Sequence, residues 1–205
     1  KPPLSKYYVE LPPPTLTDNI SDLSRLLRGL KQNYRLSKMT VDFDTVKTLS
    51  AVLREGDWKV TVTTLVSAIG PQGTAKRRPR LIKVETGDTT ANHFSLALDI
   101  GTTTVKGQLL DLKKGRVATE SADYNRQIGY GADVITRINY CQQKGGLLTL
   151  QKAVVTTVNG IINRMLEESG INRGDINHVM LAGNTTMVQI LLGLDPKYIR
   201  LAPYT

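Results

Sequence analysis

The chain has 205 residues, with 27 lysines and arginines against 18 aspartates and glutamates, which gives a formal net charge of +9 at pH 7. This length accommodates one or two small domains that each bury a core. No apolar run approaches the roughly 20 residues that cross a bilayer, and no secretion signal opens the chain. We therefore expect a cytoplasmic protein without a membrane partner. The single cysteine, Cys141, excludes an internal disulfide, a thiolate zinc site and an iron–sulfur cluster within these residues.

A basic stretch from Lys76 to Lys83 stands between two β-rich runs. A nucleic-acid site would require aromatic platforms or a recognition helix beside this stretch, and the sequence shows neither. We therefore expect no nucleic-acid partner and interpret the stretch as a solvated loop. Attraction for phosphate or for an acidic partner is the alternative.

The first residues are rich in proline. Prolines at positions 2, 3 and 12–14 fix φ and remove amide donors, so residues 1–14 are expected to form an extended linker. From Ile20 onward, apolar residues recur every three or four positions. This spacing predicts an amphipathic helix with Thr17 or Asp18 as its N-cap.

A second helix and two strands are predicted next. Asp44 is a suitable cap for the helix, and Gly56 is a natural left-handed stop at its end. Residues 58–66 are dominated by β-branched side chains, and residues 80–85 form another short run of the same kind. The sequence therefore predicts a small α+β domain over residues 15–92.

The remainder of the chain, residues 93–205, has a different pattern. Short turns join three predicted strands, which favours an antiparallel meander. The strands are expected at residues 94–100, 105–112 and 116–124. Two helices follow, and then a short buried strand from His178 to Gly183 leads into a further helix. The predicted order in this second domain is βββ-αα-βα.

The stretch from Ala97 to Lys106 is the most informative about chemistry. A strand ends at Asp99, and a glycine and three threonines follow before the next strand. Backbone amides in such a turn form an anion-binding nest, hydroxyls add donors, and a lysine adds a compact positive charge. We therefore predict a site for a phosphate chain at Gly101, Thr102, Thr103, Thr104 and Lys106. Asp99 is expected to hold Mg²⁺, directly or through water. An ordinary hairpin in which Asp99 accepts turn amides is the alternative.

A second candidate for phosphate contact is the strand-to-helix junction at Gly183, Asn184 and Thr185. Amides at a helix N-terminus can face an anion there. A simple N-cap by Asn184 or Thr185 is the other interpretation, and the two are compatible. No residue is predicted to be catalytic, and a catalytic base is expected to lie outside these residues.

Other polar residues are interpreted as structural. Asp133 and Arg137 are four positions apart on a predicted helix, so a surface ion pair is favoured over a catalytic pair. Cys141 lies on the apolar face of that helix and is expected to be a small buried side chain. His178 is expected at a strand edge, because no carboxylate or thiol partner for a metal lies near it in the sequence.

The turn from Asp99 to Lys106 resembles the first phosphate motif of the ATPase superfamily that includes actin, heat-shock chaperones, and sugar and glycerol kinases (the ASKHA superfamily). Within that superfamily, the chain resembles ATP-dependent reductive activators of corrinoid proteins more closely, over almost its whole length. The stretches that carry this resemblance are Ala97 to Lys106, Gly131 to Ile138, Ala182 to Met187, and Pro14 to Leu27.

The resemblance implies that residues 15–92 are the middle domain of such an activator. Residues 93–205 would then be the first, incomplete lobe of an actin-like, ribonuclease H-like ATPase domain. It also implies ATP and Mg²⁺ as cofactors, a corrinoid methyl-transfer protein as partner, and a homodimer. Such activators take one electron through an iron–sulfur ferredoxin domain and return cobalt(II) corrinoid to cobalt(I). ATP binding and hydrolysis change the grip on the corrinoid partner.

The sequence departs from the complete family pattern in two places. Neither a cysteine-rich electron-carrying domain nor a second ATPase lobe is recognisable in it. We therefore expect a segment of a longer protein that binds ATP weakly or not at all by itself. Two other interpretations remain open: a lobe of a sugar-type kinase, which would leave the residues before His93 unexplained, and a non-enzymatic fragment that docks another protein through residues 15–88.

Overall fold

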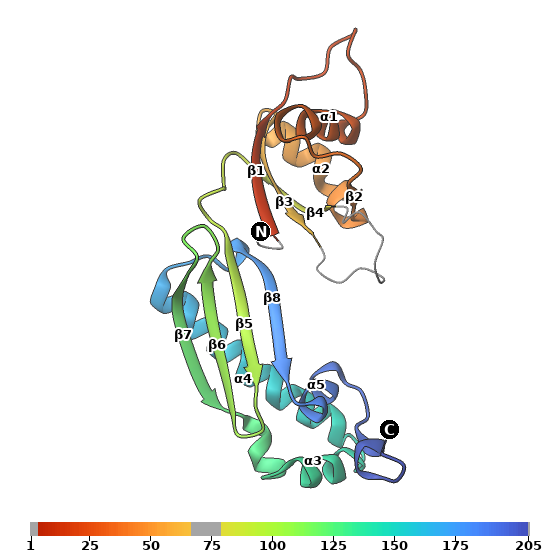
Figure 1. The fold of residues 1–205 in the computed structure, drawn as a ribbon, viewed down its shortest axis with the longest axis vertical. Coiled ribbons are helices and arrows are strands. Elements are labelled where there is room, and N and C mark those ends of the chain that lie inside the picture. Colours follow the sequence, from red (N-terminus) through yellow and green to blue (C-terminus); the bar gives the residue numbers. More distant parts are fainter. Residues whose placement is uncertain (1–3, 67–78, 205) are drawn as a thin grey trace. The chain divides into compact units, whose positions relative to one another are not determined.

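A computed structural model describes residues 4–66 and 79–204. The chain divides into two compact units, Lys1–His93 and Phe94–Thr205, which are drawn in Figure 1 and are treated separately below. The basic stretch lies outside the described residues up to position 78.

The first unit combines one sheet with two helices. Its elements are β1 (Leu4–Glu10), α1 (Asp22–Tyr34), β2 (Thr40–Val41), α2 (Phe43–Glu55), β3 (Lys59–Leu65) and β4 (Arg80–Thr86). The strand order is β1-β3-β4-β2, with β3 antiparallel to both of its neighbours and β2 parallel to β4. Apolar side chains from α1 and α2 pack against β3 to form the core. The α+β character predicted for this region is confirmed.

The linker predicted over residues 1–14 is wrong for residues 4–10, which form β1. This strand pairs with β3 along its entire length. Leu4 and Val9 are buried, with 1% and 2% of their surfaces exposed. The prolines flank the strand without interrupting it, so every ladder position in β1 retains its amide donor.

Both helices begin at a residue other than the predicted cap. Ser21, not Thr17 or Asp18, is the N-cap of α1, and its hydroxyl accepts a hydrogen bond from the third residue of the helix. Asp42, not Asp44, precedes α2, and Asp44 lies in the first helical turn. Serine, threonine and aspartate are all favourable at the start of a helix, so the residue type alone does not determine where each helix begins.

Gly56 ends α2, but not in the predicted left-handed conformation, since its φ is −83°. A β-carbon at this position would lie 2.5 Å from the carbonyl oxygen of Lys59. The glycine is therefore required by close backbone approach. Asp57 and Trp58 adopt the positive φ values instead, at 48° and 62°, and turn the chain into β3.

Asp18 is held by two arginines of α1. Arg25 Nη1 donates to its carboxylate at 2.7 Å, and Arg28 Nη1 donates at 3.0 Å. Hydrogen bonds from Arg28 and then from Arg25 lower the pKa of Asp18 from 3.8 to about 2. Because the folded-state pKa is depressed, this stabilisation is complete above the unfolded-state pKa and is lost as the pH falls through the folded-state value.

We expect Asp18→Asn to melt at a lower temperature than the wild type at neutral pH. The difference should shrink as the pH is lowered from about 4 toward 2, because the wild-type carboxylate becomes protonated there. Thermal melts followed by circular dichroism measure this dependence. Asp44→Asn is a matched control, since Asp44 is largely exposed and pairs with Lys47 at the surface, so that its loss should have a smaller effect. A melting difference for Asp18→Asn that does not change with pH would contradict the assignment.

The second unit contains a mixed sheet and three α-helices. Its strands are β5 (Phe94–Ile100), β6 (Thr104–Asp111), β7 (Arg116–Tyr124) and β8 (Ile176–Gly183). Its α-helices are α3 (Val134–Cys141), α4 (Gly146–Ser169) and α5 (Thr185–Leu192), and the 3₁₀ turns are η1 (Arg126–Tyr130), η2 (Arg173–Asp175) and η3 (Lys197–Arg200). The strand order is β7-β6-β5-β8. Strands β5, β6 and β7 form an antiparallel meander, and β8 is parallel to β5. The predicted order βββ-αα-βα is confirmed.

Helix α4 covers one face of this sheet (Figure 1). Leu96, Leu98 and Ile100 of β5 point into the core, whereas the alternate residue Asp99 is exposed on the opposite face. A β-carbon at Gly107 would lie 2.8 Å from Ile161 Cγ2, so this glycine lets α4 lie close to β6. Among the described residues, no helix is both long enough and apolar enough to span a membrane.

Candidate functional site

Asp99 lies near the carboxyl end of β5 on the sheet face opposite α4. Its direct cross-strand neighbour is Lys106 of β6, so both side chains project from the same face. A hollow of about 270 Å³ opens here, and its lining residues are Ala97, Leu98, Asp99, Lys106, Gln108, Met180 and Ala182. The lining of this hollow therefore includes one carboxylate and one ammonium group.

The donor set at Asp99 suits a hydrated Mg²⁺ ion rather than a transition metal. Within residues 4–66 and 79–204, no cluster of three or more His, Cys, Asp or Glu side chains could enclose a metal. Mg²⁺ is commonly held by one or two carboxylates, with water and phosphate oxygens as its other ligands. A single exposed carboxylate beside the predicted phosphate turn fits that mode of binding.

Lys106 already has an acidic partner, because its Nζ lies 3.1 Å from the carboxylate of Glu120 on β7. Gln108 donates to the same carboxylate at 2.9 Å. These hydrogen bonds, from Gln108 and then from Lys106, lower the pKa of Glu120. Both members of the pair are about half exposed. An exposed pair of this kind contributes little stability, so Lys106 can exchange its partner for a phosphate at small cost.

The turn that follows β5 is closed by a hydrogen bond from the amide of Gly101 to the carbonyl of Thr104, at 3.0 Å. A β-carbon on Gly101 would lie 2.4 Å from that carbonyl oxygen. The turn therefore requires glycine at this position. Thr103 and Thr104 are exposed and Thr102 is partly buried, so hydroxyl groups remain accessible at the turn.

Three consecutive carbonyl groups of the turn accept hydrogen bonds from two buried residues. The amide of Asn125 donates to Thr103 at 2.8 Å, and the Asn125 side chain donates to Gly101 at 2.9 Å. Arg137 Nη2 donates to the carbonyl of Thr102 at 2.6 Å. In a trans peptide, the N–H and C=O groups point in opposite directions. Anchored carbonyls therefore direct the turn's amides away from the interior.

The strand-to-helix junction meets this turn. Asn184 Nδ2 donates to Thr102 Oγ1 at 3.1 Å, and Asn184 Oδ1 accepts from the amide of Met187 at 3.0 Å. Asn184 is thus the N-cap of α5, as predicted, and Thr185 is the first helical residue. A β-carbon on Gly183 would lie 2.9 Å from the carbonyl oxygen of Ile100, so the glycine permits close approach of the two strand ends.

The structure therefore brings the predicted turn and the predicted strand-to-helix junction into contact, and it places Asp99 and Lys106 beside them. The turn from Gly101 to Thr104 contacts the junction from Gly183 to Thr185 at the carboxyl ends of two parallel strands. Asp99 and Lys106 lie on the adjoining sheet face. Amides at the end of a strand and the N-terminus of a helix are a suitable combination for an anion.

Asp133 and Arg137 do not form the predicted surface ion pair. Asp133 caps α3 by accepting a hydrogen bond from the amide of Thr136 at 2.9 Å. Arg137 is fully buried, with 0% of its surface exposed. Arg137 lies on the same side of the helix as Val134 and Cys141, and this periodicity indicated burial. The four-residue spacing from Asp133 favoured a surface ion pair instead.

Asn125 and Gln127 were not singled out from the sequence, yet both are completely buried next to the turn. Gln127 donates to the carbonyl of Leu150 at 3.0 Å and accepts from Arg137 at 3.1 Å. Neither lies in a periodic segment. The only hint was that polar side chains follow directly after a strand.

Two further predictions are confirmed. Cys141 is buried, and burial raises the pKa of its thiol to about 11, which suits a packing role rather than a reactive one. His178 lies on β8, an edge strand within the described sheet, and its Nδ1 is 3.3 Å from Ser95 Oγ.

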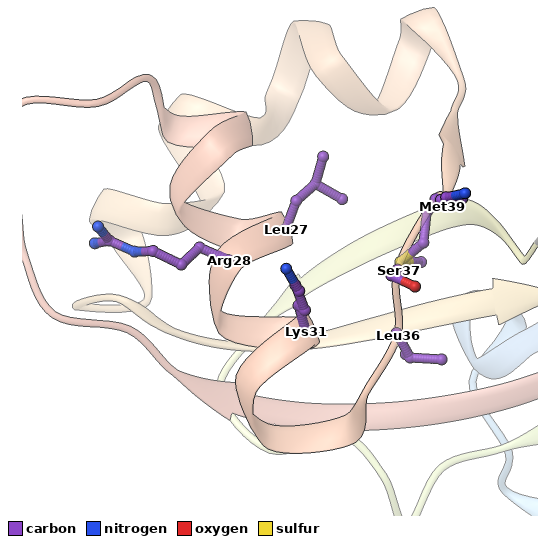
Figure 2. A pocket seen from close by; sticks show the side chains of 7 residues that line it. Leu27, Arg28, Lys31, Leu36, Ser37 and Met39 are labelled. Carbon is purple, nitrogen blue, oxygen red and sulfur yellow. The ribbon is translucent and has the colours of Figure 1, made fainter.

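A larger hollow of about 630 Å³ lies in the first unit, at the end of α1. Figure 2 shows side chains of α1 and of the segment after it around this hollow. Its lining residues are Leu27, Arg28, Lys31, Leu36, Ser37, Lys38 and Met39. It has basic and apolar character, but no carboxylate or imidazole lines it. The site that combines a carboxylate, hydroxyls and directed amides is the one in the second unit.

These features define a sheet lobe whose parallel strand ends present a hydroxyl-rich turn and a helix N-terminus, an arrangement typical of anion-binding α/β proteins. Comparison with family models identifies the family. Residues 1–91 match the RACo linker region, and residues 94–205 match the RACo middle region. The chain belongs to this family of reductive activators of corrinoid proteins. The α+β unit predicted as a middle domain thus corresponds to the family's linker region, and the predicted ATPase lobe corresponds to its middle region.

Two relatives agree with this assignment. The corrinoid activation enzyme RamQ of Eubacterium limosum is 36% identical over 112 residues, which cover 54% of this chain and 19% of RamQ. A solved structure of a reductive activator for corrinoid, iron–sulfur protein matches 100% of this chain, with 36% identity and a TM-score of 0.83. The chain spans 31% of that protein, so both relatives are much longer than the residues described here.

Proposed function

We propose that these residues are part of an ATP-dependent reductive activator that returns inactive cobalt(II) corrinoid protein to cobalt(I). The family match over both units and the names of the two relatives support the corrinoid role. A sugar-type kinase lobe is less consistent with them, because residues 1–91 also match the activator family. The proposal includes a corrinoid protein as partner, a homodimer and a cytoplasmic location.

The observation that carries the nucleotide part of this proposal is the contact between Asn184 and Thr102. It joins the hydroxyl-rich turn to the N-terminus of α5, so directed amides and hydroxyls converge on one place. In the proposed complex, Gly101 to Thr104 and the start of α5 bind the phosphate chain. Asp99 orients the hydrated Mg²⁺, and Lys106 adds positive charge.

ATP, when bound, supplies the free energy that makes an unfavourable electron transfer possible. A ligand shifts a conformational equilibrium only by its differential affinity for the two states. In the proposed cycle, nucleotide binding changes the activator's grip on the corrinoid partner, while the electron arrives from an iron–sulfur domain outside these residues. The role of this chain is to hold the phosphates and the Mg²⁺ ion in a fixed orientation.

The test uses the full-length protein, its corrinoid partner and a chemical reductant. Cobalt(I) formation is followed by absorbance with Mg·ATP, with Mg·ADP and without nucleotide, and nucleotide affinity is measured by isothermal titration calorimetry. We expect saturable Mg·ATP binding and cobalt(I) formation that requires ATP. Equal rates of cobalt(I) formation with and without ATP would refute the proposal.

A further inference from the structure

Of the four stretches that carry the sequence resemblance, three lie in the second unit, and the side chain of Arg137 contacts all three. Its Nη2 donates to the carbonyl of Thr102 in the first stretch, at 2.6 Å. Its Nε donates to the carbonyl of Gly131 in its own stretch, at 2.9 Å. Its Nη1 lies 3.2 Å from the sulfur of Met187 in the third. One guanidinium group therefore connects segments that are distant in the chain.

The surroundings of this guanidinium are unusual for a buried cation. The acceptors around Arg137 are backbone carbonyls, the Gln127 amide oxygen and a thioether, all of which are neutral. The carboxylate of Asp133, one helical turn earlier, is used to cap α3. The charge of Asp133 still favours the charged guanidinium, but burial outweighs it and lowers the pKa of Arg137. A buried cation whose direct acceptors are all neutral is costly for a folded protein, which suggests a function beyond stability.

We propose that Arg137 is a positioning residue for the phosphate turn: its guanidinium fixes the carbonyl of Thr102 inward, and this holds the turn's amides in the orientation that a phosphate group requires. Asn125 does the same for the carbonyls of Gly101 and Thr103. The inference rests on the proposed function for the identity of the ligand, but not for the contact between Arg137 and the turn.

The positive charge of Arg137 has a second consequence for this site. The guanidinium contacts the carbonyl of Thr102 and is buried, so its charge is weakly screened. A phosphate chain over the turn supplies the negative charge that the neutral acceptors do not. The buried guanidinium therefore favours an anion at the turn without touching it.

Arginine is required at this position because its acceptors lie in several directions. The planar fork of a guanidinium can donate along all of them, whereas a lysine ammonium is a single point charge on a flexible stem. The space for this fork depends on Gly131, where a β-carbon would lie 3.1 Å from Arg137 Cγ and 2.8 Å from Thr136 Oγ1.

The test compares Arg137→Lys and Arg137→Met with the wild type in the full-length protein. Mg·ATP affinity is measured by calorimetry, and hydrogen–deuterium exchange of the peptide containing residues 101–104 is measured without nucleotide. We expect both variants to bind Mg·ATP roughly tenfold to a hundredfold more weakly and to exchange faster at the turn. Gly131→Ala, which crowds Arg137 without removing it, should act in the same direction.

Arg25→Lys is the matched control, because Arg25 is the other fully buried arginine of the described residues and lies in the first unit, with 1% exposure. It should lower the melting temperature while Mg·ATP affinity and exchange at the turn remain unchanged. Wild-type affinity in Arg137→Lys would overturn the positioning role, since the charge alone would then suffice. Equal weakening in Arg25→Lys would overturn it too, by assigning the effect to general destabilisation.

Failure of the proposed function has a different signature. A wild-type protein that binds no nucleotide would refute the proposed function, and the exchange measurement would still decide the inference. Faster exchange at residues 101–104 in Arg137→Lys, but not in Arg25→Lys, would support the hold of Arg137 on the turn. Unchanged exchange would overturn it.

Discussion

Gly101→Ala is expected to abolish ATP-dependent cobalt(I) formation and to weaken Mg·ATP binding by about a hundredfold or more. The new β-carbon would lie 2.4 Å from the carbonyl oxygen of Thr104, a backbone atom that cannot move without opening the turn. Opening the turn breaks the hydrogen bond between the Gly101 amide and Thr104 and redirects the amides that follow. Calorimetry with Mg·ATP and the cobalt(I) assay measure both effects.

Gly160→Ala provides the control for Gly101→Ala. Gly160 lies within α4, and a β-carbon there would meet no atom within 4 Å. Alanine is a better helix former than glycine by about 1 kcal/mol, so this variant should melt at the same temperature as the wild type or higher, with unchanged nucleotide affinity. If Gly101→Ala binds Mg·ATP as tightly as Gly160→Ala does, the turn is not the phosphate site.

Asp99→Asn is expected to lower the rate of ATP-dependent corrinoid reduction by roughly a hundredfold or more, while the iron–sulfur centre proposed for the full-length protein remains reducible. The substitution keeps the size of the side chain and removes the charge that would hold Mg²⁺. Asp99 is exposed, so the free energy of unfolding should change by less than about 0.5 kcal/mol. The rate is measured over a range of Mg²⁺ concentrations.

Glu167→Gln is the control for Asp99→Asn, because it removes an exposed carboxylate from α4, on the other face of the sheet. It should leave both the rate and its dependence on Mg²⁺ unchanged. Undiminished cobalt(I) formation in Asp99→Asn would show that this carboxylate has no part in the nucleotide site.

The second unit was predictable from sequence because its signals are local. Alternation along β5 separates Leu96, Leu98 and Ile100 from Asp99, and short turns leave an antiparallel meander as the simplest arrangement. Asn184 stands between a buried strand and an amphipathic helix, where an N-cap is expected. The turn and the junction were therefore identified as separate candidates before their contact was known.

The predictions that were wrong depended on non-local contacts. β1 was missed because the residues that pair with it in β3 lie 49 to 61 positions further along the chain, and because nearby prolines dominated the local pattern. The role of Arg137 was missed because the spacing from Asp133 favours an exposed pair, whereas two of the acceptors of Arg137, in Thr102 and Met187, lie far away in the chain. Helix periodicity indicates which side of a helix is buried, but not what a buried polar group will meet.

The contact between Asn184 and Thr102 spans 82 positions of the chain. A contact of such long range closes a large loop, which costs more conformational entropy than a local contact does. A chain that has formed its meander but has not placed β8 beside β5 therefore has a phosphate turn without its helix N-terminus. Under the proposed function, a nucleotide at this site would require β8 in register beside β5, so that its binding would report on the pairing of the last strand of the described sheet.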